Sequence, residues 1–526
     1  MKYNFWFILI GVLLTISNLY SQSTYFIKYK NSVTIQEMDY KVFQQKLIPS
    51  GINSPLDKEL ISVDYLAKGL AREDEILSRI IKVSFEKSVL EANINNLKVS
   101  DPEIEYIQKS TNYKIDIVPN DTLLSEQWAL EKIQAFDAWD KTEGVDTVLL
   151  AVIDTGIDYL HPDLQNKIYL NTGEIGIDVN GNYKTLNGID DDGNGFVDDF
   201  RGWDFTDRVG FPFDSSGGDY LDWDNDPIDE HGHGTYIGGI AGAEVNNIIG
   251  IAGVAPKIQI VNLRAFDPAG FGEEDDVAAA ILYAVQIGVK VINMSFGDNA
   301  FSLVLRDVIK FAFDRGVVLV GSSGNSGSTA PHYPSGYSEV ISVGNSTIDD
   351  FVSGSSNYGS TLDLVAPGSS IVTTARNNNY ASISGTSAAT PHVAATAALI
   401  LSLQHFTNEE VKQIIKSTSD DIGEPGWDLR SGAGRLNLFR ALTVIAPSVI
   451  KINSPTQDFA TLDDQITVNA SVLSASFVSY SLYYGTGYNP VNWITLIENE
   501  ITQFNNEDIY SLDISSLPDT VYAFRL

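Results

Sequence analysis

Three polar residues in this sequence stand in surroundings that suit nucleophilic catalysis. Asp154 ends the apolar run AVID, His233 lies between two glycines in GHGTYIGG, and Ser387 lies in SGTSAATPHVA, with Pro391 expected in the first turn of the next helix. A serine hydroxyl is a weak nucleophile until a neighbouring imidazole takes its proton. The imidazole in turn needs a carboxylate that fixes its tautomer and stabilises its charged form. Together the three residues predict acyl transfer through a serine.

Each residue taken alone has a plainer interpretation. An aspartate at a strand end is usually a cap or an ion-pair partner, a histidine among glycines is usually structural, and a serine before a helix is ordinarily its N-cap. The prediction therefore depends on the combination, and on the elements that bring the three residues together.

Those elements are predicted between about residues 121 and 445, where short β-branched runs alternate with helical patterns. Helices are expected over 273–288 and 303–315. Apolar strands that alternate with helices indicate a parallel sheet covered on both faces, with its active site beyond the carboxyl ends of the strands. The expected strands are VLLAVID (148–154), KIQIVNL (257–263), KVINMSF (290–296), GVVLVGSS (316–323) and VISVGN (340–345).

Both flanks of this region differ from it. Residues 1–21 have one Lys, an apolar run from Phe5 and then polar residues, the layout of a cleaved secretory signal peptide. Residues 22–120 are nearly neutral, with 13 Lys and Arg against 14 Asp and Glu, whereas residues 121–526 have 20 against 54. This break predicts a separate leading module of mixed strand and helix.

After Pro447, alternating patterns such as QITVNASV and SYSLYYG predict a β-sandwich of about 80 residues. Because such a sandwich expects one more strand after VYAFRL, we expect the sequence to be a fragment.

The overall composition excludes several classes of function. A net charge of −34 argues against binding to nucleic acids or to anionic membranes, which requires cationic surface. The absence of cysteine excludes disulfides, thiolate–zinc sites, iron–sulfur clusters and cysteine nucleophiles. Stability must therefore come from packing or from hard cations.

Residues 171–230 contain 16 acids and three bases, and they include a pattern typical of a calcium loop. In DDDGNGFVD a glycine, Gly195, takes the sixth position, where a calcium loop turns sharply. The twelfth position is Arg201 rather than Glu, so the loop is not an EF-hand, and Asp199 or Asp204 is the candidate for the missing carboxylate. The candidate ligands at positions one, three, five, seven and nine are Asp190, Asp192, Asn194, the Phe196 carbonyl and Asp198.

The segments AVIDTGID, GHGTYIGG and SGTSAATPHVA resemble the three signature blocks of the subtilisin-like serine proteases, the subtilases, and the similarity runs over residues 121–445. The resemblance implies that Asp154 orients the imidazole, that His233 is the general base and then the general acid, and that Ser387 attacks the carbonyl. His231 competes with His233 for the role of base, but only His233 is followed by the Gly-Thr of the family motif.

The same resemblance implies the parts around the nucleophile. Asn325 in SSGNSG matches the family's oxyanion asparagine. A substrate is expected to lie extended between Ser295, Phe296 and Gly297 on one side and Ser322, Ser323 and Gly324 on the other. His332 falls near the pocket floor, usually a small residue, and this departure predicts a narrower pocket or a preference for polar side chains.

The resemblance also implies a tight calcium site and a prosegment. The expected calcium ligands are the side chains of Asp121, Asp163 and Asn247 and the carbonyls of Val245, Ile249 and Ile251. Residues 22–115, which end in a segment resembling the closing half of subtilase prosegments, are expected to assist folding and to inhibit the enzyme intramolecularly, with self-cleavage within 105–120.

The predicted organisation is a signal peptide (1–21), a small α+β prosegment (22–115), a three-layer α/β catalytic domain of the subtilisin type with a mainly parallel sheet (116–446) and a β-sandwich domain (447–526), the last possibly truncated at its end. The predicted function is that of a secreted, calcium-stabilised serine endopeptidase that acts on proteins or peptides and has no membrane span after signal removal. A non-catalytic surface protein on the same scaffold is the alternative, but a complete triad and Asn325 speak against it. A related acid-active family replaces the histidine by glutamate, and the intact GHGT speaks against that reading.

Overall fold

The computed structural model describes residues 23–30, 60–66, 76–85, 98, 101–110, 118–207, 218–219, 221–457, 459–475 and 477–526. The expected signal peptide, residues 1–21, lies outside the described residues. The chain divides into two compact units, Met1–Ile117 and Val118–Leu526, which are described separately.

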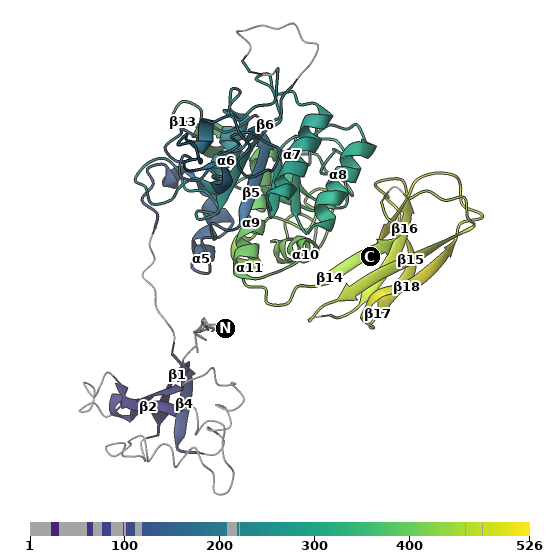
Figure 1. Ribbon diagram of the computed structural model, residues 1–526. Coiled ribbons are helices and arrows are strands. Elements are labelled where there is room, and N and C mark those ends of the chain that lie inside the picture. The colour runs from purple at the N-terminus through teal and green to yellow at the C-terminus, as the bar shows by residue number, and fades with distance from the viewer. Residues whose placement is uncertain are drawn as a thin grey trace, which may run out of the picture. The chain divides into compact units, whose positions relative to one another are not determined.

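The first unit contains a four-stranded antiparallel sheet in the order β2-β3-β1-β4 (Figure 1). Tyr25, Ile27 and Tyr29 alternate along β1 and are all buried, so one face of the sheet carries the core. Most residues of this leading module lie outside the described ones, so its expected helical part stays a prediction. The strands are β1 (Ser23–Tyr29), β2 (Leu60–Tyr65), β3 (Ile80–Phe85) and β4 (Ile104–Lys109), with a 3₁₀ turn η2 (Leu77–Arg79).

The second unit is built on a seven-stranded sheet in the order β11-β10-β9-β8-β5-β7-β6, in which all neighbours are parallel. The expected α/β class and parallel sheet are confirmed, and the five predicted runs are all strands. Two short edge strands, β6 and β11, were not predicted. The strands are β5 (Leu149–Asp154), β6 (Trp203–Asp204), β7 (Gln259–Arg264), β8 (Val291–Met294), β9 (Val318–Ser322), β10 (Val340–Ser346) and β11 (Leu364–Pro367).

Helices cover both faces of this sheet and give three layers (Figure 1). Along β5, Leu150 and Val152 pack into the cluster that contains α6 (His233–Gly242), α9 (Thr386–Leu403) and α10 (Asn408–Thr418). Ala151 and Ile153 face the other way, toward α7 (Glu274–Gln286) and α8 (Leu303–Asp314). This alternation explains why the strand sequences are apolar throughout.

The longest helix of the described residues, α9, is long and apolar enough to cross a membrane, but most of it is buried in the protein, as expected of a core helix.

The remaining elements are short. The short elements are α4 (Trp128–Lys132), α5 (Ala135–Trp139), α11 (Leu438–Ala441), the 3₁₀ turns η3 (Leu124–Glu126), η4 (Thr172–Glu174) and η5 (Lys184–Leu186), and the hairpin of β12 (Ile371–Ala375) and β13 (Asn379–Ile383).

The C-terminal part consists of two three-stranded antiparallel sheets, β14-β15-β18 and β17-β16-β19, which confirms the expected β-rich domain. Two side chains from this part accept hydrogen bonds from the α/β part: Gln457 from the Ser338 N–H and Asn489 from the Ser360 N–H, both at 2.6 Å. The strands are β14 (Val449–Ser454), β15 (Gln465–Leu473), β16 (Tyr480–Thr486), β17 (Ile494–Glu500), β18 (Phe504–Asp513) and β19 (Tyr522–Arg525).

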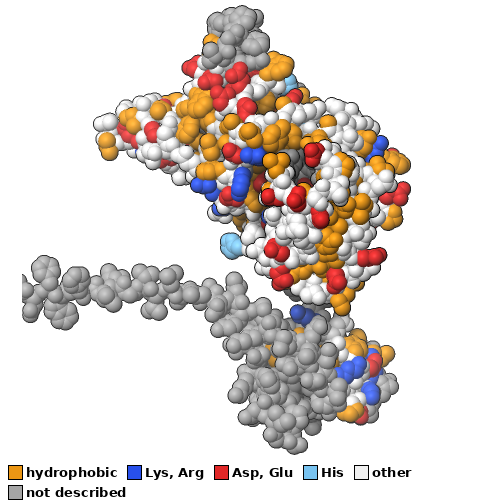
Figure 2. Space-filling model, turned by 90° about the vertical axis from the view of Figure 1, so that its right-hand side faces the viewer, with side chains coloured by type: hydrophobic (Ala, Val, Ile, Leu, Met, Phe, Trp, Pro, Cys, Tyr) orange, Lys and Arg blue, Asp and Glu red, His pale blue; other side chains and the backbone are white. Residues whose placement is uncertain are grey.

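The surface reflects the acidic composition. On the face drawn in Figure 2, acidic side chains are spread over the larger unit among apolar and uncharged ones. Such a surface favours solubility and disfavours polyanionic partners.

Candidate active site

The three candidate catalytic residues lie at ends of elements that meet at one edge of the sheet. Asp154 is the last residue of β5, His233 is the first residue of α6 and Ser387 is the second residue of α9. Because β5, β8 and β9 are parallel neighbours, the segments that follow their carboxyl ends lie at the same edge.

Asp154 and His233 form a direct pair. The Oδ1 atom of Asp154 lies 2.7 Å from Nδ1 of His233 and also accepts a hydrogen bond from the Thr155 N–H at 2.8 Å. The carboxylate is buried, whereas 29% of the His233 side chain is exposed. Burial lowers the pKa of His233, but the charge and hydrogen bond of Asp154, together with the charge of Asp229, outweigh it, so that the pKa is raised above its ordinary value.

A second buried carboxylate, Asp229, holds the segment around His233. Its oxygens accept hydrogen bonds from the backbone N–H groups of residues 231, 232 and 235 and from the hydroxyls of Thr155 and Thr235. Sequence reasoning missed this residue, because the N-cap of α6 is Gly232 and Asp229 lies three residues before that position.

Close approach of two backbones completes this arrangement. A Cβ atom on Gly234 would lie 2.0 Å from the carbonyl oxygen of Gly156, so only glycine allows α6 to begin against the end of β5. This contact places the His233 ring beside Asp154.

The Ser387 hydroxyl donates a hydrogen bond to the Ser295 carbonyl at 2.9 Å, and within the described part of the chain no hydrogen bond joins Ser387 to His233. In return, the Ser295 hydroxyl donates to the Ser387 carbonyl at 3.0 Å. That carbonyl lacks its usual helical donor because residue 391 is proline. Pro391 lies in the second turn of α9 rather than in the first, because the helix begins one residue before Ser387.

Asn325 follows β9 and is exposed beside the start of α9. Its side-chain oxygen accepts hydrogen bonds from the N–H and the hydroxyl of Thr386, at 2.9 and 3.2 Å, which leaves the amide N–H₂ as its free end. The Ser387 N–H lies in the first turn of α9, where N–H groups have no partner within the helix. Two donors therefore lie next to the candidate nucleophile.

The two expected substrate-binding segments flank the same point. Ser295, Phe296 and Gly297 follow β8, while Ser322 ends β9 and Ser323 and Gly324 follow it. The Ser322 hydroxyl donates to the Phe296 carbonyl at 3.4 Å, and the imidazole Nδ1 of His332 lies 2.9 Å from the Ser322 carbonyl.

The structure brings together the side chains of the first expected calcium site. Asn247 donates from its amide to Asp163 at 2.7 Å, and its backbone N–H lies 3.3 Å from Asp121. The Ile251 N–H donates to Asp163, while Val245 and Ile249 lie in the same loop. Burial raises the pKa of Asp121, and the charge of Asp163 adds to this effect.

The second expected site is arranged differently from its linear pattern. Asp190 accepts hydrogen bonds from the backbone of residues 193–195, and Asp198 turns to the N–H groups of residues 187 and 188. Asn194 donates to Asp199, and the Phe196 ring packs against Trp203, Phe205 and Tyr283.

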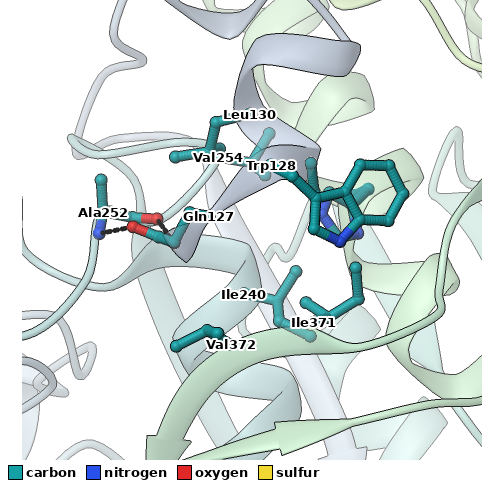
Figure 3. Close-up of a pocket in the computed structure, with 10 residues that line it drawn as sticks. Gln127, Trp128, Leu130, Ile240, Ala252, Val254, Ile371 and Val372 are labelled. Atoms are coloured by element: carbon teal, nitrogen blue, oxygen red, sulfur yellow. Dashed lines mark hydrogen bonds between the residues drawn. The ribbon is translucent and has the colours of Figure 1, made fainter. Parts of the chain in front are cut away.

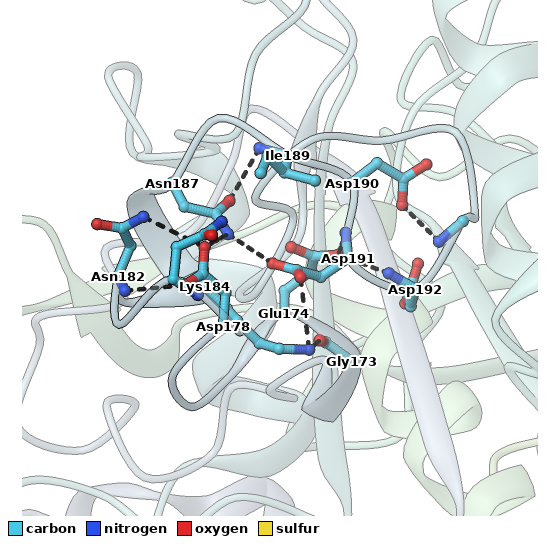
Figure 4. Close-up of polar contacts among 12 residues, drawn as sticks. Gly173, Glu174, Asp178, Asn182, Lys184, Asn187, Ile189, Asp190, Asp191 and Asp192 are labelled. Carbon is cyan, nitrogen blue, oxygen red and sulfur yellow. Dashed lines mark hydrogen bonds and ion pairs between the residues drawn. The ribbon is translucent and has the colours of Figure 1, made fainter.

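Three carboxylates converge instead around Asp192. One oxygen each of Glu174, Asp192 and Asp199 lie within 4.8 Å of one another, which is close enough to hold a metal ion. Figure 4 shows Glu174 and Asp192 of this group. Glu174 and Asp199 are fully buried, and the Oε2 atom of Glu174 has no hydrogen-bond partner among the described residues. Burial raises the pKa of both, and the neighbouring carboxylates add to the rise. Sequence spacing gave no signal for Glu174, which lies on η4, far before the loop.

One pocket of the second unit is lined by none of the candidate site residues (Figure 3). It is small and is lined mainly by apolar side chains of α4, α6 and β12. His392 on α9 also lines it, and burial lowers the pKa of this histidine to about 4, so the ring is neutral. With a neutral, apolar lining, the pocket carries no sign of the chemistry at Ser387.

Comparisons with known proteins agree with this architecture. The model of the subtilase family matches residues 146–434. A thermophilic serine proteinase of Bacillus sp. (strain AK1) is 35% identical over 397 residues, covering 73% of this chain and 86% of that protein. Thermitase of Thermoactinomyces vulgaris is 37% identical over 327 residues, covering 62% of this chain and 99% of that protein. The halolysin-like extracellular serine protease Nep of Natrialba magadii is 31% identical over 367 residues, covering 69% of this chain and 60% of that protein.

The family match covers more than half of the chain, and it includes β5, α6 and the start of α9. The chain therefore belongs to the subtilase family, and it is a subtilisin-like serine endopeptidase.

Proposed function

We propose that this endopeptidase uses Ser387 as its nucleophile, His233 as its general base and acid, and Asp154 as the carboxylate that orients the imidazole. The observation that carries the proposal is the 2.7 Å contact between Asp154 Oδ1 and His233 Nδ1, since it leaves Nε2 as the nitrogen that can take a proton from the serine. Asn325 and the Ser387 N–H are the proposed donors to the oxyanion.

In the proposed reaction, rotation about the Cα–Cβ bond moves the Ser387 hydroxyl from the Ser295 carbonyl to the imidazole. The hydroxyl oxygen attacks the substrate carbonyl while His233 takes its proton. His233 then gives this proton to the leaving amine, and an acyl-enzyme forms. Water, deprotonated by the same imidazole, releases the acid and restores the serine.

A serine-directed fluorophosphonate tests the assignment. We expect the purified protein to cleave a peptide library, to lose this activity after labelling and to carry the label on Ser387, as mapped by peptide mass spectrometry. A label on another serine with loss of activity would refute the choice of nucleophile.

Replacing Asn325 by alanine is expected to lower kcat by about 10²–10³ with little change in KM, because the amide is proposed to bind the oxyanion only as it forms. Steady-state kinetics on a peptide substrate measure this. Ser326→Ala, a change in the exposed neighbouring residue, is the matched control and is expected to leave kcat within about twofold. Equal losses in the two variants would contradict the role of Asn325.

The pH dependence of kcat/KM should report on His233. Since only the neutral imidazole accepts a proton, and its pKa is raised above the ordinary 6.5, activity should fall as the pH drops through a midpoint above 6.5. Asp229→Asn removes a charge that raises this pKa and should move the midpoint to lower pH. Asp275→Asn, which removes the same charge from the exposed start of α7, is expected to leave the midpoint unchanged. A midpoint that Asp229→Asn leaves in place would contradict this reading.

We further propose that calcium stabilises the enzyme at two places. Asp121, Asp163 and Asn247, with the carbonyls of Val245, Ile249 and Ile251, are the proposed ligands of the first. Asp192 is proposed for the second, where the residues fit a hard cation because an oxygen of Glu174 lies near two further carboxylates and its Oε2 atom has no hydrogen-bond partner among the described residues. The other loop positions, the side chains of Asp190, Asn194 and Asp198 and the carbonyl of Phe196, remain proposed as ligands. Bound calcium would neutralise the carboxylates and hold the loops.

Export and activation complete the proposal. The apolar run that begins at Phe5 supports secretion. The Natrialba relative, which is named an extracellular protease, supports it as well. Residues 22–115 are proposed to act as a prosegment that inhibits the enzyme until it is cut within 105–120. Substrates are proteins or peptides.

A further inference from the structure

In a bound substrate, the side chain of the residue whose carbonyl is attacked must lie beside the segments that border Ser387. Ser295 exchanges two hydrogen bonds with Ser387, and Asn325 is bonded to Thr386, so the segments 295–297 and 322–325 both border the nucleophile. A carbonyl held between the Ser387 hydroxyl and the Asn325 amide has its own side chain beside these two segments.

The imidazole of His332 lies between the same two segments. A Cβ atom on Gly297 would lie 2.5 Å from His332 Cε1, and one on Gly324 would lie 2.9 Å from its Cδ2. The ring therefore touches the backbone on both sides. A hydrogen bond from Nδ1–H to the Ser322 carbonyl, at 2.9 Å, fixes its orientation.

The charge of the ring bears on what the space accepts. Burial lowers the pKa of His332, although the carbonyls of Ser322 and Gly297 and the charge of Asp298 oppose this effect. The imidazole is neutral at neutral pH, and so it offers no positive charge to an acidic side chain.

We propose that His332 restricts the residue N-terminal to the cleaved bond to small side chains, namely glycine, alanine or serine, and excludes aromatic and long aliphatic ones. The reason is steric, since the ring occupies volume that a large side chain would need, and close-packed sites tolerate extra groups poorly. This inference rests on the proposed function, because it takes Ser387 as the nucleophile.

Peptides that differ only at this residue test the proposal. The full-length protein is assayed with alanine, serine, phenylalanine, leucine and glutamate at that position. We expect kcat/KM for alanine to exceed that for phenylalanine by at least about tenfold. His332→Gly should raise kcat/KM for phenylalanine by at least about tenfold and leave that for alanine within about threefold. His405→Gly, the same change in the exposed segment after α9, should leave the whole profile unchanged.

The outcomes separate the two proposals. A wild-type preference for phenylalanine, leucine or glutamate overturns the role of His332, as does an unchanged profile in a His332→Gly protein whose Ser387 still takes a fluorophosphonate label. No cleavage of any peptide together with no label on Ser387 in the wild type overturns the proposed triad instead. If His332→Gly does not fold, the wild-type profile and His332→Ala decide.

Discussion

Ser387→Ala is expected to lower kcat by at least about 10⁴-fold while KM changes little, because the variant keeps the binding segments and loses the attacking atom. The residual rate would come from the two oxyanion donors acting on attack by water. Active-site titration with a fluorophosphonate and steady-state kinetics on a peptide substrate measure both quantities.

The same variant reports on maturation. If the enzyme cuts its own prosegment, wild-type protein should begin within 105–120 and Ser387→Ala protein should retain the preceding residues, as N-terminal sequencing would reveal. Ser384→Ala, three residues earlier in the chain, is the matched control and should mature normally. Identical mature ends in wild type and Ser387→Ala would argue against self-cleavage.

Removal of calcium is expected to have the second largest effect. An ion that binds only the folded chain, at about 1,000 times its Kd, contributes about 4 kcal/mol, and its loss should lower the thermal midpoint on the order of 10 °C. Differential scanning calorimetry with excess calcium and with excess chelator measures the difference. An unchanged midpoint in chelator would sink the calcium proposal.

Glu174→Gln sharpens this test at the second site. With calcium present the variant should melt below the wild type, because it loses a ligand. In chelator it should melt at or above the wild type, since one of three mutually repelling carboxylates, two of them buried, is gone. Glu424→Gln, in an exposed loop, should show no such reversal of sign. A loss of equal size with and without calcium would assign Glu174 to packing alone.

The sequence predicted the sheet well because its strands are buried on both faces, so each is a continuous apolar run such as LLAVID. It missed β6 and β11, edge strands of two and four residues, because runs as short as WD and LVAP are not distinguished from loop segments by pattern alone. The candidate triad could be predicted because each member lies in a short, dense motif.

Contacts between distant segments were beyond sequence reasoning. Asp199 was a candidate from the loop pattern, but Glu174 meets Asp192 and Asp199 only because the chain folds back on itself, and nothing in its spacing indicates this contact. Likewise, a linear loop pattern could not tell that Asp198 would turn toward the backbone of residues 187 and 188. The side chain of Asp229 is similar, since its partners include Thr155, directly after β5, and Thr235 on α6.

The acidic segment, residues 171–230, contacts the hydrophobic core of the second unit. Tyr283, buried on α7, donates its hydroxyl to Asp199 at 2.6 Å and stacks edge-on against Phe196. A variant without residues 171–230 would lose both Phe196 and Asp199. The buried ring of Tyr283 would then lose an aromatic neighbour, and its hydroxyl would lose its hydrogen-bond acceptor. For protein engineers, the part of this segment around Phe196, Trp203 and Phe205 therefore belongs to the core.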